Sequence, residues 1–187
     1  NLRPIPADKA EFPVLVEDSK GIKLYYQQDT EFQRPKASYR YKIDIPEKYT
    51  DIHSYVLMTL YLAAVNESMN EASYPARLAG MDYEVSNDEE GISITVNGYS
   101  DSVDDVLKEI LSNMSDITMP DGQFEALRDQ MVRDWKNVLL GDAYRIARDN
   151  MRKIVKKYYY DSSEMAEAAA GISLEEIKSF SKMLLKK

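Results

Sequence analysis

MDYEVS at residues 81–86 and ISITVN at residues 92–97 decide the fold of this chain. In both stretches apolar and polar side chains alternate, which is the pattern of a strand with one buried face. The residues between them, NDEEG at 87–91, are polar and end in glycine, a combination typical of turns. The pair therefore predicts an antiparallel β-hairpin whose apolar side carries Tyr83 and Val85.

A further strand is predicted at residues 37–45, ASYRYKIDI, where the alternation is nearly complete. Pro46 ends this strand, because proline has no N–H to offer the next bond of the ladder. Two shorter apolar stretches, at residues 14–16 and 22–26, lie on either side of the turn-like residues 19–21. Together with the hairpin, these stretches predict a mostly antiparallel sheet.

The rest of the chain shows helical spacing of its apolar residues. Residues 51–65, behind a cap at Thr50 or Asp51, are apolar on nearly every side and predict a central buried helix. Residues 66–78 predict a second helical segment, with Pro75 marking a break or a new first turn. Further helices are predicted over residues 103–114, 121–138, 143–157 and 174–184, the last behind a capping box of Ser173 and Glu176.

Strands near the start and helices after them predict an α+β fold, with the helices packed on one face of the sheet. Residues 1–12 hold Pro4 and Pro6 with little periodicity and predict an extended linker segment. Residues 13–187 are predicted to form a single domain, because a chain of 187 residues with 44% hydrophobic content is long enough for one core.

Composition excludes several classes of partner. The chain has 24 basic and 32 acidic residues and a formal net charge of -8, which argues against nucleic acid, because neutralising phosphates requires a basic surface. No apolar run approaches the roughly 20 residues that span a bilayer, so we expect no membrane partner. The start of the chain lacks the pattern of a signal peptide. The absence of cysteine fits a reducing or an oxidising compartment equally.

His53 is the single histidine of the chain, and there is no cysteine. A zinc site needs three or four nitrogen, sulfur or carboxylate ligands, so neither the usual zinc sites nor the H-x-x-E-H motif can be assembled. A Ser/His/Asp triad would depend on His53, and no nucleophile-elbow sequence accompanies it. The chain alone is therefore predicted to be no enzyme, with no catalytic, cofactor-binding or metal residue, and His53 is expected to be a surface residue.

Three other groups of residues are weaker candidates for a site. The 14 tyrosines, Tyr158–Tyr160 among them, suggest a peptide-binding surface, but such rings more often divide between core and surface. The carboxylates at residues 88–90 and 101–105 lack the spacing of a calcium loop, and the second group is expected at a helix N-terminus. Lys153 and Lys156 are expected near a helix C-terminus, where they favour the macrodipole.

A set of short stretches, in order along almost the whole chain, resembles the third homologous domain of the insulysin/pitrilysin zinc peptidases. None of them is diagnostic alone, and the ordered set carries the resemblance. They are NLRPIP at 1–6, LYYQQD at 24–29, RPKA at 34–37, NEA at 70–72, ARLAGMDY at 76–83 and VNGYS at 96–100.

The resemblance implies the function of a non-catalytic domain. Enzymes of this family consist of four repeats of one α+β fold, shared with the mitochondrial processing peptidase superfamily, which form two bowl-like halves around a closed chamber. Only the first repeat carries the zinc motif. The resemblance thus implies that this domain forms part of the chamber and of the interdomain contacts. Its partners would be the other domains of the same polypeptide and peptide substrates, with zinc held by the catalytic domain of the parent.

The resemblance also assigns positions. The zinc-motif helix of the active repeat corresponds to residues 57–62, LMTLYL, which contain neither histidine nor glutamate. The remaining zinc glutamate of the family corresponds to a position near Asp134, and one carboxylate alone does not hold zinc. In the active repeat a strand edge binds the peptide backbone. We accordingly expect the hairpin of this repeat to position substrate, with Tyr83 and Tyr99 as the substrate-contact residues.

The end of the chain gives one more expectation. Domains of the resembled family finish with a strand, whereas this sequence stops on its last predicted helix, so the final strand is expected to be missing and one sheet edge unpaired.

Two alternatives to the leading function stay open. The chain can be a subunit or domain of a pseudopeptidase or processing-peptidase-like assembly, or a free-standing protein interaction module.

Overall fold

The computed structural model describes residues 12–19, 21–29, 32, 34–45, 51–87, 91–156 and 158–184, without the side chains of residues 71–73, 139 and 145. The predicted linker up to residue 11 lies outside this part of the chain. The expected roles of Pro46, Thr50, the carboxylates at 88–90 and the chain end after residue 184 lie outside it as well. Within the described residues, no helix combines the length and apolarity needed to cross a bilayer.

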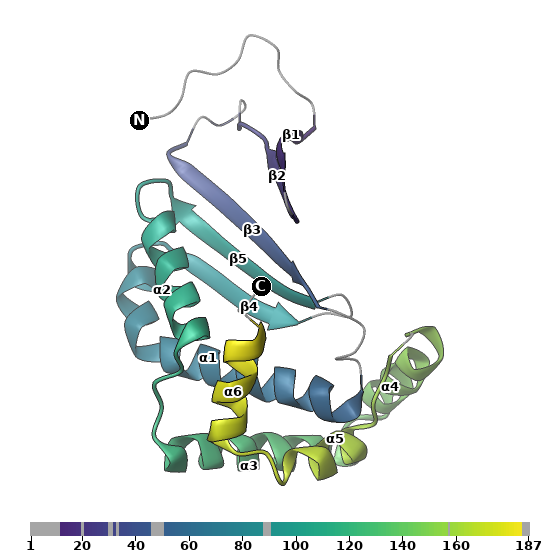
Figure 1. Ribbon diagram of the computed structural model, residues 1–187. Coiled ribbons are helices and arrows are strands. Elements are labelled where there is room, and N and C mark those ends of the chain that lie inside the picture. The colour runs from purple at the N-terminus through teal and green to yellow at the C-terminus, as the bar shows by residue number, and fades with distance from the viewer. Residues whose placement is uncertain are drawn as a thin grey trace.

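A three-stranded antiparallel sheet is the centre of the fold (Figure 1). Its strands are β3 (Lys36–Asp44), β5 (Gly91–Tyr99) and β4 (Asp82–Asn87), in the order β3-β5-β4. Val96 of β5 lies opposite both Tyr39 of β3 and Tyr83 of β4. The predicted hairpin and the predicted strand at residues 37–45 are therefore confirmed, and the hairpin supplies the central strand.

One face of this sheet is covered by helices. Ile94 and Val96 point into the core and are buried, as the alternation predicts. Helix α1 (Ile52–Leu78) packs against β4, and α2 (Val103–Ser115) packs against β5 and β3. The α+β architecture with helices on one face of an antiparallel sheet is confirmed.

Helix α1 corrects one expectation, because it runs through Pro75 without a break. Pro75 lies in the last turn, so its missing N–H costs a single intrahelical bond near a free end. The amide of Ala79 still donates to the carbonyl of Pro75 at 3.1 Å, which continues the helix past the proline. Gly80, with a φ of +81°, then ends the helix in the left-handed conformation that favours glycine.

Four helices and a short 3₁₀ turn complete the helical layer. They are α3 (Asp121–Asn137), η2 (Val138–Leu140), α4 (Ala143–Val155), α5 (Ser162–Ala169) and α6 (Leu174–Leu184). Helix α5 was not predicted from the sequence, although Asp161 and Glu164 form a complete capping box at its start. Helix α4 ends two residues before the predicted limit, and α3 and α6 follow the predicted spans closely.

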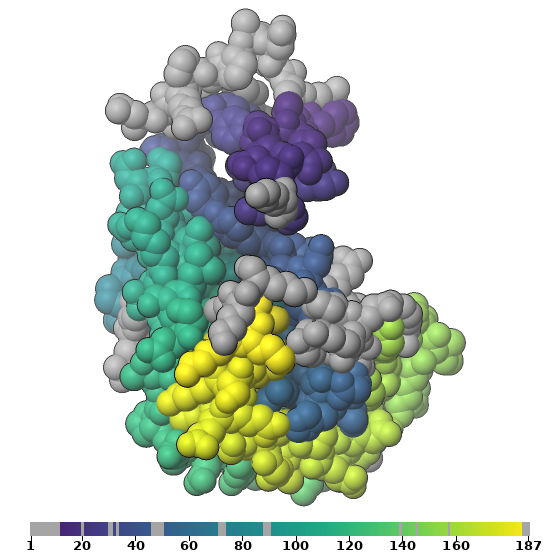
Figure 2. All heavy atoms as spheres, viewed as in Figure 1, coloured from purple at the N-terminus to yellow at the C-terminus, as the bar shows by residue number. Residues whose placement is uncertain are grey.

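The strands β1 (Val14–Ser19) and β2 (Ile22–Tyr26) form a separate two-stranded antiparallel sheet. Gly21 forms part of their turn with a φ of +86°, in agreement with the predicted turn at residues 19–21. Every residue of both strands is exposed. Figure 2 shows this hairpin standing clear of the helical body.

The carbonyl oxygen of Met114 joins three helices in the core. Met114 lies in the last turn of α2, where a carbonyl has no partner within its own helix. The hydroxyl of Tyr61 on α1 donates to it at 2.7 Å and the hydroxyl of Ser181 on α6 donates to it at 2.6 Å. Burial raises the pKa of Tyr61 to about 12, so the phenol keeps its proton at every physiological pH.

We expect Tyr61→Phe and Ser181→Ala each to lower the free energy of unfolding by about 1 kcal/mol, because the Met114 carbonyl keeps one donor in either variant. The double variant removes both donors from a buried carbonyl, so its loss should exceed the sum of the single losses by about 1 kcal/mol. Urea denaturation measures all three. Tyr26→Phe, which removes a hydroxyl bonded to Gln28 on the surface, is the control and should change stability by less than about 0.5 kcal/mol. Strictly additive losses would contradict the role of the carbonyl.

Candidate functional site

The segment that corresponds to the zinc motif of the resembled family lies inside the core. It occupies the middle of α1, where Leu57, Leu60 and Leu62 are buried and Thr59 bonds to the carbonyl of Tyr55. Asp134, the carboxylate singled out on the later helix, is exposed and accepts a hydrogen bond from Gln130 at 2.8 Å. Among the residues that the structure describes, no three histidine, aspartate or glutamate side chains converge as a metal site would require.

His53 is exposed, as expected, and it also has a partner that the sequence does not reveal. Its Nε2 lies 2.8 Å from Oε1 of Glu176, so the first turn of α1 is linked to the first turn of α6. Both side chains keep substantial contact with solvent, so this pair contributes at most about 1 kcal/mol. The geometry indicates that the His53–Glu176 pair links α1 to α6.

Asp51 caps the start of α1, in agreement with one of the two predicted caps. Its carboxylate accepts hydrogen bonds from the hydroxyl of Ser54 at 2.6 Å and from the amide of Ser54 at 3.0 Å. These bonds hold the pKa of Asp51 below its ordinary value, because they favour the ionised carboxylate. The cap fixes the helix end that carries His53 and Tyr55.

We expect Asp51→Ala to destabilise the chain by about 1 kcal/mol at neutral pH. The folded-state pKa of Asp51 is lowered, so its stabilisation is present above the unfolded pKa of about 4 and is lost as the pH falls through the folded pKa. The difference between wild type and Asp51→Ala should therefore shrink at acidic pH, as measured by urea denaturation between pH 3 and 7. Asp51→Asn keeps a capping oxygen and should lose less at neutral pH. A difference independent of pH would refute the assignment.

The second face of the sheet carries polar side chains, and Tyr99, one of the two predicted substrate-contact residues, lies there. Alternation along each strand places them on the side opposite the helices. We call this surface the open face; its members are Ser38, Arg40, Lys42, Asp82, Glu84, Ser93, Thr95, Asn97 and Tyr99.

Charge is divided across the open face. The cations Arg40 and Lys42 belong to β3 at one edge, and the carboxylates Asp82 and Glu84 belong to β4 at the other edge. The central strand between them contributes neutral groups such as Thr95. The surface is thus basic along one edge and acidic along the other, and both edges can meet the polar groups of an extended peptide.

Tyr83 and Tyr99, the two predicted substrate-contact residues, lie on opposite faces of the sheet. Tyr99 is 48% exposed at the end of β5 on the open face, where Nζ of Lys36 lies 5.6 Å from its ring centre. Tyr83 is only 7% exposed on the helix face, with the guanidinium of Arg77 5.4 Å from its ring centre. Of these two tyrosines, only Tyr99 has a ring that solvent or a ligand can reach in this domain.

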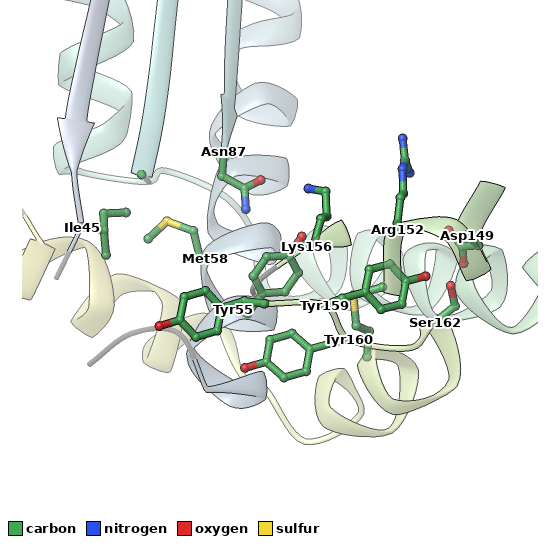
Figure 3. A pocket seen from close by; sticks show the side chains of 13 residues that line it. Ile45, Tyr55, Met58, Asn87, Asp149, Arg152, Lys156, Tyr159, Tyr160 and Ser162 are labelled. Atoms are coloured by element: carbon green, nitrogen blue, oxygen red, sulfur yellow. The ribbon is translucent and has the colours of Figure 1, made fainter. Parts of the chain in front are cut away.

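A cavity of about 200 Å³ lies where α1, α4 and α5 meet the end of β4 and the start of β5 (Figure 3). Its wall contains the tyrosines Tyr55, Tyr158, Tyr159 and Tyr160, with Arg152 and Lys156 at the side of α4. The rings of Tyr55 and Tyr160 lie 5.4 Å apart. The tyrosine run at residues 158–160 is half-buried, whereas Tyr25 and Tyr26 are exposed, so the tyrosines divide between core and surface.

Two tyrosines of this cavity, Tyr159 and Tyr160, are neutral phenols, and charged groups of Asp149, Arg152 and Lys156 lie beside them. Burial first, and then a hydrogen bond to the carboxylate of Asp149, raise the pKa of Tyr159 far above its ordinary value. Burial and the nearby charge of Asp51 raise the pKa of Tyr160 in the same direction. Protonated phenols donate hydrogen bonds and stack, but they supply neither a nucleophile nor a general base at neutral pH.

Comparison with known proteins identifies the family to which this geometry belongs. A family model described as the middle or third domain of peptidase M16 matches residues 1–168. The chain is a middle or third domain of the peptidase M16 family. The resemblance to the third domain of insulysin/pitrilysin peptidases is therefore confirmed.

The proteins related to this M16 domain are much longer than the chain. Human insulin-degrading enzyme is 28% identical over 182 residues, which cover 97% of this chain and 18% of that enzyme. The A-factor-processing enzyme of Saccharomyces cerevisiae is 23% identical over 168 residues, 90% of this chain and 16% of the enzyme. The protein named "Putative zinc protease mug138" of Schizosaccharomyces pombe is 25% identical over 178 residues, which cover 95% of this chain and 18% of that protein.

The fold of the M16 domain also matches a solved structure. The crystal structure of pitrilysin superposes with a TM-score of 0.84 at 19% identity, covering 95% of this chain and 19% of that one. The chain spans about a fifth of the length of the relatives and of the solved chain that it matches.

Proposed function

We propose that this chain is a non-catalytic domain of a multidomain zinc metallopeptidase, in which it forms part of the wall of a substrate chamber. The observation that carries the proposal is the position of residues 57–62. The family match places the chain among M16 peptidases, while the helix segment that would carry the metal motif of an active repeat packs apolar side chains into the core. Zinc would belong to the catalytic domain of the parent.

The contribution of this domain is confinement and positioning of a peptide. The open face of the sheet supports this role, because it is broad, polar and bordered by opposite charges at its two edges. A wall of this kind acts on substrate affinity and on the equilibrium between open and closed forms of the parent, and leaves the bond-breaking chemistry to the metal domain. The domain's remaining surfaces contact other domains of the same polypeptide.

The isolated chain should bind no stoichiometric zinc and cleave no peptide, because a single histidine and scattered carboxylates cannot provide three ligands. Equilibrium dialysis against zinc and a fluorogenic peptide assay test this expectation. The full-length polypeptide should bind zinc and cleave in the same assays. His53→Ala is the control for trace binding: zinc bound to other groups of the chain would remain bound in this variant. Stoichiometric zinc on the isolated chain, or chelator-sensitive cleavage by it, would overturn the proposal.

Tyr99→Ala in the full-length polypeptide should raise KM for a peptide substrate about twofold to tenfold, up to about 1.4 kcal/mol of binding, while zinc content stays full. The reason is that Tyr99 offers an exposed ring on the open face. Tyr99→Phe keeps the ring and should retain most of the affinity.

Tyr83→Ala separates stability from substrate contact, because Tyr83 is buried and its truncation should destabilise the isolated chain by about 3 kcal/mol. Unchanged kinetics in a folded Tyr99→Ala enzyme would remove Tyr99 from the substrate surface. Loss of zinc from that folded variant would show that this domain supports the metal site directly.

A further inference from the structure

Helix α4 is the most strongly amphipathic element of the domain. Its residues Ala143–Val155 include four basic side chains and one acidic one, a net charge of +3 in a chain of net charge -8. Four of its apolar residues recur at spacings of three, four and seven, which gathers them on one side of the helix, whereas Ile146 lies on the opposite side and is half-buried. We call the side of these four residues the α4 apolar face; it consists of Tyr144, Met151, Ile154 and Val155.

The polar side of α4 faces the body of the domain. Asp149 accepts a hydrogen bond from Tyr159, and the ammonium group of Lys153 binds the carboxylate of Asp161. Lys153 also lies 5.8 Å from the ring centre of Tyr159. Figure 3 shows Asp149 near Tyr159 at the tyrosine-lined cavity, and the Arg152 side chain pointing away from the tyrosine rings. The helix is thus held to the body by Asp149 and Lys153 together with the half-buried Ile146, whereas most of its large apolar side chains lie on the outer side.

The α4 apolar face consequently faces solvent. Its four side chains are 60–86% exposed, and Leu140 of η2, just before the helix, is 82% exposed. Within the described residues, the main contact of α4 with another element is with η2, and Figure 1 shows α4 at the outer end of the helical layer, near α5. Single exposed apolar residues are normal, but a contiguous stripe on an outward-facing helix marks a surface that is covered by a partner.

We propose that the α4 apolar face docks against another domain of the same polypeptide. This inference rests on the proposed function, which assigns the chain to a multidomain parent. More than four fifths of the length of the matched relatives lies outside the span of this chain, so a covering surface can be supplied within one molecule. Covalent linkage raises the effective concentration of that surface, so a contact of modest area is sufficient.

Charge specifies the chemistry of the covering surface. Arg148 and Arg152 lie along the edge of the α4 apolar face, one turn apart. The partner surface should therefore present an apolar strip bordered by carboxylates, which would pair with these guanidinium groups. A second copy of this chain meets the requirement poorly, because a symmetric contact through α4 would bring like charges together. An anionic lipid surface would attract the basic helix α4 locally, but the rest of this chain of net charge -8 would oppose its close approach.

Hydrogen exchange of the α4 amides tests the proposal. We expect these amides to exchange at least about tenfold more slowly in the full-length polypeptide than in the isolated chain, because docking suppresses local opening. The variant Ile154→Lys with Val155→Lys should restore fast exchange in the full-length polypeptide. The same variant should leave the melting temperature of the isolated chain unchanged, because both side chains are exposed there. Ala126→Lys, an equivalent change at an exposed position of α3, is the matched control and should leave the exchange of α4 unaffected.

Several results would overturn the proposal. Equal exchange of α4 in the two proteins, or slow exchange that survives the lysine variant, would show that no other domain covers this face. Concentration-dependent dimerisation of the isolated chain, abolished by the lysine variant, would assign the face to a second copy. Binding of the isolated chain to phosphatidylserine-containing vesicles, lost in the same variant, would assign it to a membrane. Zinc content and peptide cleavage of the full-length polypeptide are measured separately, so failure of the proposed function is distinguishable from failure of this docking surface.

Discussion

The carbonyl oxygen of Met114 accepts two buried hydroxyl groups, and the arrangement of the helical layer depends on it. Tyr61 reaches it from α1 and Ser181 reaches it from α6, so three segments far apart in the sequence share one acceptor. Helices that pack by apolar contacts alone can shift along one another, whereas a buried hydrogen bond has a defined length and direction. The helices that carry the sheet are therefore fixed relative to one another by polar groups inside an apolar core.

Tyr61 belongs to residues 57–62, the segment that corresponds to the zinc-motif helix of an active repeat in the resembled family. In this chain the segment stabilises the core, because Leu57, Leu60 and Tyr61 are all buried. A helix that points such side chains inward has no room for ligands, and adding two histidines would leave imidazoles buried without partners. In this chain the middle of the central helix, residues 57–62, packs its apolar side chains into the core.

Sequence patterns predict the parts of this structure whose signals are local. Period-2 alternation locates β3, β4 and β5. Pro75 was expected to interrupt a helix and does not, because the effect of a proline depends on how near the helix end it lies. The open face depends on the pairing of β3 with β5, and the link between His53 and Glu176 joins residues 123 positions apart. No window of sequence contains both partners.

The pairing of β3 has a consequence for how the nascent chain matures. Ser38 of β3 binds Asn97 of β5 across 59 residues, whereas β4 and β5 are neighbours in the sequence. Ribosomes add about 5–20 residues per second, so β3 leaves the ribosome seconds before its partner exists. During that interval an alternating strand is a template for wrong pairing with other chains. Lys36, Arg40 and Lys42 alternate with the apolar residues of β3, and repulsion between these like charges is well placed to keep the waiting strand soluble until β5 arrives.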